Sequence, residues 1–531
     1  MKCFDDVTIV NMRLKQLTAL LAFCCLTGAG VLAQDRKKDE KKASELIEQP
    51  KRVEFEIKNT NYEDYVVYSC EEEGLSVYHQ TEHKNKDGYL WEFIKLDTAL
   101  DMKWRKELYL PFASRIIGYD YSPGFMYYLI REKQYKQEEL LVMRMDLEKG
   151  DTTKFNINTV FPVNLTQFEV VGSTILMGGY TNYRPVIIRY NLFDQRPQVV
   201  PGFYADYAEI LRLETDDRLR TFTVTMSEKT TDKRTTLSVR SFSESGDMIR
   251  NILLQPDESK SLINGAPARL EMDRQFIAGT YGHKRSTYSR GLYIATVGND
   301  GQQKIDYYNY ADLENFFSYM RAKREQRIKE KISRRKVQGK RVKFNYRLLV
   351  HDIIQDGDKY TLYGEAYYPR YSNYSGYDRF GGYTYGRSNT YFNPNFLGYK
   401  YTHAVVMTFD KSGKLLWDNS FEINDVTSYD LQQFVHVSTS GDEVALLYMF
   451  ENVIRSKIIK SDEIIEGKTF NDIELTFEDD EVRVSDNEVG GLSVWYGKTF
   501  YTYGIQDIKN LKDNRVNLNR NVFFINKVVY R

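Results

Sequence analysis

The chain has 531 residues, and its 74 Lys and Arg balance its 74 Asp and Glu, so that it carries no net charge. This balance argues against nucleic acid as a partner, and the length predicts either several domains or one large repetitive domain. Aromatic residues make up 14 % of the chain, with 42 Tyr and 29 Phe, whereas Pro occurs only 11 times. Because aromatic residues favour strands, we expect a β-rich protein.

Residues 1–33 are predicted to be a signal peptide for export. A short basic stretch at Met12–Lys15 precedes an apolar stretch at Leu17–Leu26, and small residues precede a cleavage site after Ala33. We expect translation to start at Met12, because the acidic residues ahead of it are unusual before a signal peptide. Cleavage would leave an exported protein in the periplasm or outside the cell, and association with the cell envelope stays open.

Two alternatives to a cleaved signal stay open. One is an uncleaved membrane anchor, and the other is a lipoprotein modified at Cys24 or Cys25. No later segment has 18 consecutive apolar residues, so we predict that the mature chain does not span a membrane. Cleavage would leave Cys70 alone, without a disulfide partner, and its alternating surroundings predict a small buried hydrophobe.

Residues 34–52 are highly charged and are predicted to be a linker, because such a composition cannot offset the entropy of ordering. From Val53 onward the pattern is that of strands. A hairpin recurs there: Phe409–Trp417, FDKSGKLLW, aligns without gaps on Leu96–Trp104, LDTALDMKW. The shared Asp can accept backbone N–H groups in the turn, and the shared Trp can pack between neighbouring units, so we interpret both as structural.

The spacing of these turns predicts the fold. From Asp97 the turn recurs after 49, 45, 51 and 56 residues, and a repeat of about 40–50 residues with several strands is typical of a β-propeller blade. We predict an all-β protein in which residues 53–531 form a β-propeller of eight four-stranded blades, with seven as the alternative. Val53–Ile57 is expected to complete the last blade, which removes exposed sheet edges. We expect a monomer.

One interval is about one repeat too long, the 112 residues between positions 298 and 410. Its first insert, residues 312–343, is predicted to be a basic helix that carries Phe316 and Phe317 in an apolar stripe and ends at Gly339. From position 321 to 343 there are twelve Lys and Arg against two Glu. The helix is either a solvated element on the rim or a docking surface for an acidic protein, phosphorylated lipid headgroups or another polyanion.

The second insert, residues 367–400, is predicted to be a long loop within the sixth blade, because it shows no helical or strand period over most of its length. Ten Tyr and five Gly fall within the 35 residues 367–401. These tyrosines either recognise a partner or pack on each other and on the blade. The candidate partner-binding residues in the two inserts are Arg321, Lys323, Arg324, Arg327, Tyr371, Tyr374, Tyr377, Tyr383 and Tyr385.

No recognisable catalytic, nucleotide-binding or metal-binding motif is present, so we predict no catalytic residues and no cofactor. His79 and His83 have helical metal-ligand spacing, but their surroundings predict a strand end, where residues i and i+4 lie about 13 Å apart. A glycosidase needs only two carboxylates, and the sequence singles out no pair.

The hairpin Asp410–Trp417 resembles the D-x-x-T-G-x-x-x-W repeat of quinoprotein-type propellers, with Ser412 in place of Thr and a spacing one residue shorter. Residues 289–426 also resemble uncharacterised exported propeller-like proteins of Bacteroidota, through the motifs Tyr307–Asp312 and Asn345–Asp352 and the basic helix. The resemblance implies a propeller fold and export, and it implies no activity.

The function predicted from the sequence is that of a secreted or periplasmic propeller scaffold. It would bind a protein or glycan partner, mainly through the insert 312–401. The alternative is a propeller-type hydrolase that acts on glycans through carboxylates in the central channel.

Overall fold

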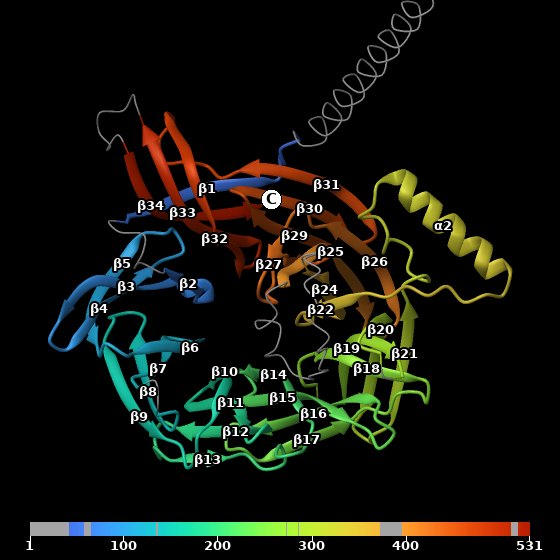
Figure 1. Ribbon diagram of the computed structural model, residues 1–531, viewed down its shortest axis with the longest axis horizontal. Coiled ribbons are helices and arrows are strands. Elements are labelled where there is room, and N and C mark those ends of the chain that lie inside the picture. The colour runs from blue at the N-terminus through green and yellow to red at the C-terminus, as the bar shows by residue number, and fades with distance from the viewer. Residues whose placement is uncertain are drawn as a thin grey trace, which may run out of the picture.

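The computed structural model describes residues 42–57, 65–133, 136–271, 273–284, 286–371, 396–510 and 519–531, with all their side chains except those of 484–489. In these ranges the chain forms eight antiparallel sheets, arranged as blades around a ring (Figure 1). Seven sheets have four strands, and the sixth has four strands with two short additional ones. The predicted all-β propeller of eight blades is confirmed.

Each of the first four blades consists of four consecutive strands, and the first strand of each lies innermost (Figure 1). Blade 1 consists of β2 (Val66–Ser69), β3 (Leu75–Asn85), β4 (Gly88–Leu96) and β5 (Met102–Leu110), and blade 2 of β6 (Arg115–Ser122), β7 (Phe125–Arg131), β8 (Glu139–Asp146) and β9 (Thr152–Asn158). Blade 3 consists of β10 (Asn164–Val171), β11 (Thr174–Thr181), β12 (Arg184–Asn191) and β13 (Pro197–Val199), and blade 4 of β14 (Glu209–Asp216), β15 (Thr221–Lys229), β16 (Thr235–Ser243) and β17 (Met248–Leu253). A short 3-10 helix, η1 (Glu71–Glu73), joins β2 to β3.

The last four blades include the insert and the closure of the ring. Blade 5 consists of β18 (Lys260–Pro267), β19 (Arg274–His283), β20 (Ser289–Gly298) and β21 (Gln303–Asn309), and blade 6 of β22 (Arg347–Val350), β23 (Ile354–Asp356), β24 (Lys359–Tyr371), β25 (Phe396–Asp410), β26 (Leu415–Glu422) and β27 (Thr427–Ser428). Blade 7 consists of β28 (His436–Ser440), β29 (Glu443–Phe450), β30 (Val453–Lys460) and β31 (Glu463–Asp472), and blade 8 of β32 (Asp480–Tyr496), β33 (Thr499–Asn510), β34 (Asn519–Tyr530) and β1 (Ile47–Glu56). Helix α2 (Ala322–Val337) lies between blades 5 and 6.

The recurring Asp turns have the predicted geometry. Asp410 Oδ1 accepts the backbone N–H groups of Ser412 at 2.8 Å and Lys414 at 3.0 Å, and Gly413 takes φ +79°. Asp97 makes equivalent bonds in the first blade. In each turn the Asp carboxylate accepts backbone N–H groups in place of a backbone carbonyl. These aspartates therefore stabilise the hairpins and have a structural role.

The seams between blades contain the buried core. Trp104 of blade 1 donates its indole N–H to the carbonyl oxygen of Leu147 in blade 2 at 3.0 Å, and Trp417 packs against the core shared by blades 6 and 7. Cys70 is fully buried between blades 1 and 2, where burial raises the pKa of its thiol to about 12. Both the predicted packing of the tryptophans and the buried thiol are confirmed.

Both ends of the chain contribute to blade 8. Strand β1 pairs antiparallel with β34, from Ile47 opposite Tyr530 to Glu56 opposite Val522. The predicted closure is confirmed, but the predicted linker 34–52 is wrong for residues 47–52, which belong to this strand. The charges and Pro50 made this segment look like a linker in the sequence. Both are tolerated in a strand because β1 is the outermost strand of the blade and its pairing shifts register at this proline.

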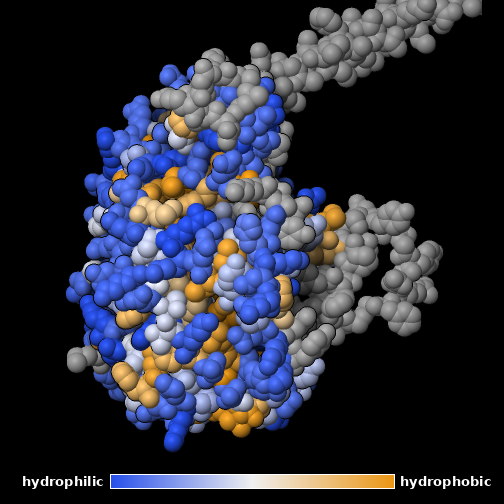
Figure 2. Space-filling model, turned by 90° about the vertical axis from the view of Figure 1, so that its left-hand side faces the viewer, coloured by the Kyte–Doolittle hydropathy of each residue, from blue (hydrophilic) through white to orange (hydrophobic). Residues whose placement is uncertain are grey.

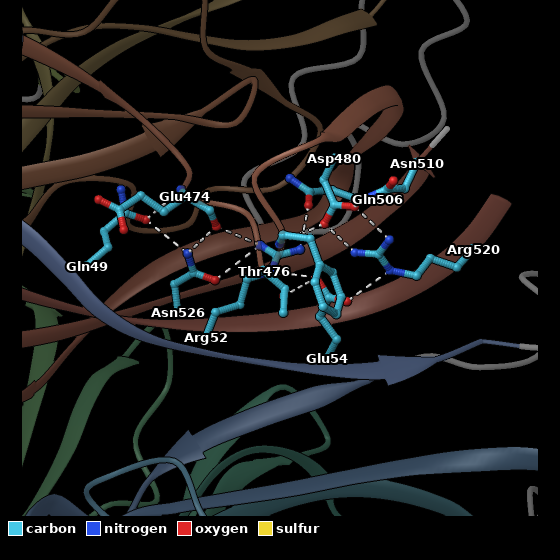
Figure 3. Close-up of polar contacts among 11 residues, drawn as sticks. Gln49, Arg52, Glu54, Glu474, Thr476, Asp480, Gln506, Asn510, Arg520 and Asn526 are labelled. Atoms are coloured by element: carbon cyan, nitrogen blue, oxygen red, sulfur yellow. Dashed lines mark hydrogen bonds and ion pairs between the residues drawn. The ribbon is translucent and has the colours of Figure 1, made fainter. Parts of the chain in front are cut away.

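A buried ionic network fastens this closure (Figure 3). Arg520 donates to both carboxylate oxygens of Asp480, at 2.9 and 2.5 Å, and to Glu54 at 3.1 Å. Arg52 donates to the other oxygen of Glu54 at 2.7 Å and to Gln506 at 2.8 Å. Because Arg52 and Glu54 lie on β1 while the others lie on β32–β34, the network joins the two ends of the chain.

The first insert departs from its prediction. The helix begins at Ala322, whereas residues 312–320 form turns. Its end is as predicted, since Gly339 takes φ +64° just beyond Val337. The predicted apolar stripe is buried without being helical, because the backbone amides of this segment find hydrogen-bond acceptors on blade 6 instead of within a helix.

The second insert is a loop over a shorter range than predicted. Residues 367–371 continue β24 and residues 396–400 continue β25, and the pairing extends to Tyr371 opposite Phe396. Cross-strand aromatic pairs such as Tyr367 with Tyr399, 5.5 Å between ring centroids, stabilise this extension. The rest of the predicted loop, 372–395, lies outside the described residues.

The side of the ring formed by blades 1 and 2 is mostly hydrophilic, with scattered apolar patches (Figure 2). Among the described residues, no helix is both long and apolar enough to cross a bilayer. The buried apolar side chains gather instead in clusters that lie within blades and in the seams between them.

Candidate functional site

The insert between blades 5 and 6 is fixed on the propeller before its helix begins. The amides of Glu314 and Asn315 donate to the two carboxylate oxygens of Asp418 at 2.9 and 2.8 Å, and the amide of Tyr319 donates to Ser420 Oγ at 3.0 Å. Burial raises the pKa of Asp418, and the amides of Asn315 and Glu314 oppose this rise. Strand β26 of blade 6 therefore holds the entry of the insert through hydrogen bonds.

Aromatic side chains of the insert are packed beneath these hydrogen bonds. The ring of Phe316 is fully buried, 4.4 Å from Tyr310 and 5.1 Å from Tyr346 between ring centroids. Tyr319 stacks on His403 of β25, with centroids 3.7 Å apart and an interplanar angle of 3°. We call residues 310–320 with these contacts the mount of the helix, because they attach α2 to the blade.

Helix α2 also contacts the protein along one face. Ile332 is buried and Ile328 packs against the same core cluster as the mount. At the C-terminal end, Lys336 forms an ion pair with Asp312 at 2.7 Å, which ties the helix back to its own entry segment. The helix is thus anchored at both ends and lies outside the ring of blades (Figure 1).

The rest of the helix surface is exposed and basic. Eight Lys and Arg residues of the helix are exposed, and two of them, Lys329 and Lys336, form ion pairs with Glu325 and Asp312. The other six, which we call the cationic face, are Lys323, Arg324, Arg327, Lys331, Arg334 and Arg335. Three of the predicted partner-binding residues, Lys323, Arg324 and Arg327, belong to this face. The fourth, Arg321, is exposed at the position just before the helix. These four residues lie close to one another at the start of α2, and their role in binding a partner stays a prediction.

The tyrosine candidates are described only in part. Tyr371 is 48 % exposed at the end of β24, and its ring lies 5.7 Å from that of Phe396. Tyr374, Tyr377, Tyr383 and Tyr385 lie outside the described residues. The aromatic part of the predicted recognition element stays a prediction.

His403, beside the mount, is a buried and uncharged histidine. Its Nδ1 shares a hydrogen bond with the Thr402 hydroxyl at 2.9 Å, whereas its Nε2 has no partner among the described residues. Burial lowers the pKa of His403 to about 3. A proton on this ring would therefore be strongly unfavourable in the folded protein.

We expect His403→Phe to reduce the acid sensitivity of the protein. Between the ordinary pKa of 6.5 and the folded pKa of about 3, the unfolded chain binds a proton that the folded chain does not, so stability falls as the pH falls. From pH 7 to pH 5 the native chain should lose about 2 kcal/mol more than the variant, measured by urea unfolding at both pH values. The exposed His283, changed to Gln, serves as control. Equal losses in His403→Phe and the native chain would contradict the assignment.

Three carboxyl groups that the sequence analysis missed lie on the innermost strands of blades 2, 3 and 4. Asp120 on β6 accepts the amide of Val170 at 2.6 Å and the hydroxyl of Tyr68 at 3.3 Å. Burial raises the pKa of Asp120 to about 7, against the opposing effect of these hydrogen bonds. Burial likewise raises the pKa of Glu214 on β14 to about 7, and burial with the nearby carboxylates raises that of Glu169 on β10.

A regularity in the repeats could have revealed these carboxyl groups. Asp120, Glu169 and Glu214 each lie two positions before the last residue of the first strand in their blade. Equivalent positions in successive blades face the same central channel, so an alignment of the inner strands would have placed them together. Next to them, Arg212 of β14 pairs with Asp352 and donates to the carbonyl oxygen of Val350 at 2.5 Å, which links blade 4 to blade 6.

A pocket of about 520 Å³ opens where blades 1, 2 and 8 meet. It is lined by the three glutamates of η1, by Tyr121 and by Val494–Gly497. Trp495 fixes one wall, because its indole N–H donates to the carbonyl oxygen of Glu71 at 2.9 Å. The acidic lining is unfavourable for an anionic ligand.

In the part of the chain that the structure describes, no group of three or more His, Cys, Asp or Glu is placed to hold a metal ion. His79, one of the spaced pair, shares a hydrogen bond with Glu92 at 2.9 Å, and its ring stacks on Tyr65 with centroids 4.0 Å apart. These contacts give His79 a structural environment within blade 1.

No protein-family model matches the chain, and no curated protein matches its sequence. Solved structures with a similar fold include the β-propeller domain of the Trilobed protease from Pyrococcus furiosus, at 10 % identity over 77 % of this chain and 93 % of that one, with a TM-score of 0.34. The polysaccharide lyase Uly1 has 8 % identity over 91 % of this chain and 99 % of its own, with a TM-score of 0.36.

An acylaminoacyl peptidase from Pyrococcus horikoshii has 9 % identity over 75 % of this chain, with a TM-score of 0.34. Only 51 % of that peptidase is covered, so this chain spans about half of its length. At such low identity these similarities concern the fold alone.

Proposed function

We propose that the protein is an exported scaffold, secreted or periplasmic, that binds an acidic partner through helix α2. The observation that carries this proposal is the contrast between the two sides of the helix. One side is packed on the propeller through Ile328 and Ile332, and the other exposes the six cations of the cationic face. A helix that served only to cover the rim would need no such concentration of like charges, which repel one another.

The rigid attachment of the helix supports docking over a purely solvated role. Ordering a charged segment costs conformational entropy, and here the mount and the Lys336–Asp312 pair offset that cost before any partner arrives. A binding element that is already ordered loses less entropy on association. The predicted signal peptide at residues 1–33 supports export.

The proposal is tested by photo-crosslinking in the native host. A photoreactive amino acid replaces Val337, which is 87 % exposed at the end of α2. The helix variant combines Lys323→Ala, Arg327→Ala, Lys331→Ala and Arg334→Ala. We expect it to reduce the partner adduct to about a tenth or less, because each cation contributes to attraction of an anionic surface.

The matched control removes the same number of positive charges far along the chain from α2. It combines Lys84→Ala, Lys86→Ala, Lys149→Ala and Lys154→Ala, all of them exposed in blades 1 and 2. This control should leave the adduct unchanged. Both variants should fold, because alanine favours the helix and the control sites lie in or beside surface turns and strands. An adduct that persists in the helix variant would contradict the proposal.

A second candidate function, hydrolysis of a glycan, is favoured by the carboxyl groups of the inner strands. A general acid at neutral pH must keep its proton, and the raised pKa values of Asp120 and Glu214 meet that requirement. Release of new reducing ends from a polysaccharide by the purified chain, lost in Asp120→Asn, would support this candidate.

A further inference from the structure

The arrangement of charge on α2 restricts the kind of partner that it can take. With 3.6 residues per turn and a rise of 1.5 Å per residue, the six residues of the cationic face fall within about a third of the helix circumference and extend over about 18 Å. Glu325 is turned away from it, paired with Lys329 at 2.8 Å, and Glu330 borders it, hydrogen-bonded by Gln326 at 3.0 Å. Lys340, Arg341 and Lys343 are also exposed in the segment that follows the helix. The result is a narrow line of cations rather than a round patch.

This helix is not built to insert into a lipid surface. An interfacial helix needs a free apolar face opposite its basic one. Here the apolar residues Ile328 and Ile332 already pack on the propeller core, and the only exposed apolar residues of the helix are Val337 and Ala322. Insertion would require the helix to leave its mount, which is held by buried aromatic rings and hydrogen bonds.

The cationic face also lacks what a folded protein partner requires. Stable protein interfaces have an apolar centre with aromatic or other large anchoring side chains, surrounded by a polar rim. Among the exposed residues of α2, none is aromatic and only Ala322 and Val337, at its two ends, are apolar. A linear polyanion needs no such centre, because its binding is driven by the release of condensed counterions when cations replace them.

We infer that the cationic face binds a linear anionic polysaccharide along the axis of the helix, an inference that rests on the proposed docking role of α2. Four of the six cations are arginines, whose planar guanidinium groups can hold a carboxylate or sulfate group through two parallel hydrogen bonds. Residues one helical turn apart lie about 6 Å apart along the axis, so successive cations can meet successive charged sugars of an extended chain. A polyuronate has the required chemistry, with one carboxylate on each sugar.

The test measures binding of the purified full chain to polygalacturonate, with dextran as the neutral probe. We expect polygalacturonate to bind, with an affinity that falls linearly on logarithmic axes as salt rises from about 50 to 200 mM, and dextran not to bind. The helix variant of Lys323, Arg327, Lys331 and Arg334 should bind about tenfold to a hundredfold more weakly and with a shallower salt dependence. The control variant of Lys84, Lys86, Lys149 and Lys154 should match the native chain.

The possible failures are distinguishable. If polygalacturonate does not bind, or binds the helix variant and the control equally, the inference is overturned. If in that case the Val337 adduct contains a protein and still depends on the cations of α2, the docking role stands and only the polysaccharide is wrong. If the adduct is also independent of those cations, the docking role fails as well.

Discussion

Replacing Asp480 by Ala is expected to destabilise the protein by about 3–5 kcal/mol. The side chain of Asp480 is 0 % exposed and that of Arg520 only 7 %. The substitution would leave Glu54 as the carboxylate partner of the buried Arg520 guanidinium, and it would remove the acceptor of the hydrogen bond that Asn510 donates to Asp480 at 2.9 Å. Urea unfolding followed by tryptophan fluorescence measures the loss.

The location of this loss can be measured as well. Because the network joins β1 to β32–β34, hydrogen exchange in Asp480→Ala should rise first in β1 and β34. Glu481→Ala is the control, since the neighbouring Glu481 is exposed and its loss should change stability by less than about 0.5 kcal/mol. Equal stability of the two variants would show that the network does not hold the ring closed.

The pH dependence of this network has a defined sign. Burial by itself would raise the pKa of Asp480, but the hydrogen bonds from Arg520 and Asn510 outweigh it and lower the pKa. Its contribution to stability is therefore present above the ordinary pKa of an aspartate and is lost as the pH falls through the lowered folded value. For this reason the difference in the free energy of unfolding between the native chain and Asp480→Ala should become smaller in acid.

Replacing Phe316 by Ala is expected to cost about 3–5 kcal/mol and to loosen the mount of α2. The ring of Phe316 is fully buried among Tyr310, Tyr346 and His403, so its removal leaves a cavity in the contact between insert and blade. Hydrogen exchange should rise in residues 310–346 before it rises in the blades. The crosslinking yield at Val337 should fall too, because a loosened helix must be ordered again on binding.

The control for Phe316→Ala is Phe193→Ala. Phe193 is 83 % exposed in the turn between β12 and β13, so its removal should change stability by less than about 0.5 kcal/mol. Unchanged hydrogen exchange across 310–346 in Phe316→Ala would mean that the hydrogen bonds to Asp418 and Ser420 hold the helix without the aromatic cluster.

The blades could be predicted from the sequence because each depends on local turn chemistry. Asp97 and Asp410 specify their turns through bonds to residues two and four positions ahead, so the pattern recurs with the repeat and shows its period. Counting the repeating units gave the prediction of eight blades. The pairing of β1 with β34 was predictable in outline, since a ring requires a partner for its last edge.

Other features depend on partners far away in the sequence, and their predictions were wrong in detail. Residues 47–52 look like a charged linker and become a strand only beside β34. Residues 312–320 have helical periodicity, but Asp418 and Ser420, about a hundred positions later, bind their amides. Tyr367 and Tyr399 are more than thirty positions apart and extend the hairpin by pairing across it.

The candidate site was predictable to the same extent. The cations of α2 lie within one short stretch of the sequence, so their concentration was visible before their surface was known. The carboxyl groups of Asp120, Glu169 and Glu214 come from three blades and meet only through the symmetry of the fold. No short sequence motif identifies them, because each is an isolated acidic residue in an ordinary strand.

The central claim, that α2 docks a partner through its exposed cations, is tested most directly by the adduct formed at Val337 in the native host. The measurement is the adduct yield of the helix variant divided by that of the control variant. The docking role predicts a ratio of about a tenth or less, because the four cations are removed from the binding surface itself. A ratio near one would contradict it and would leave the basic helix as a solvated element of the rim.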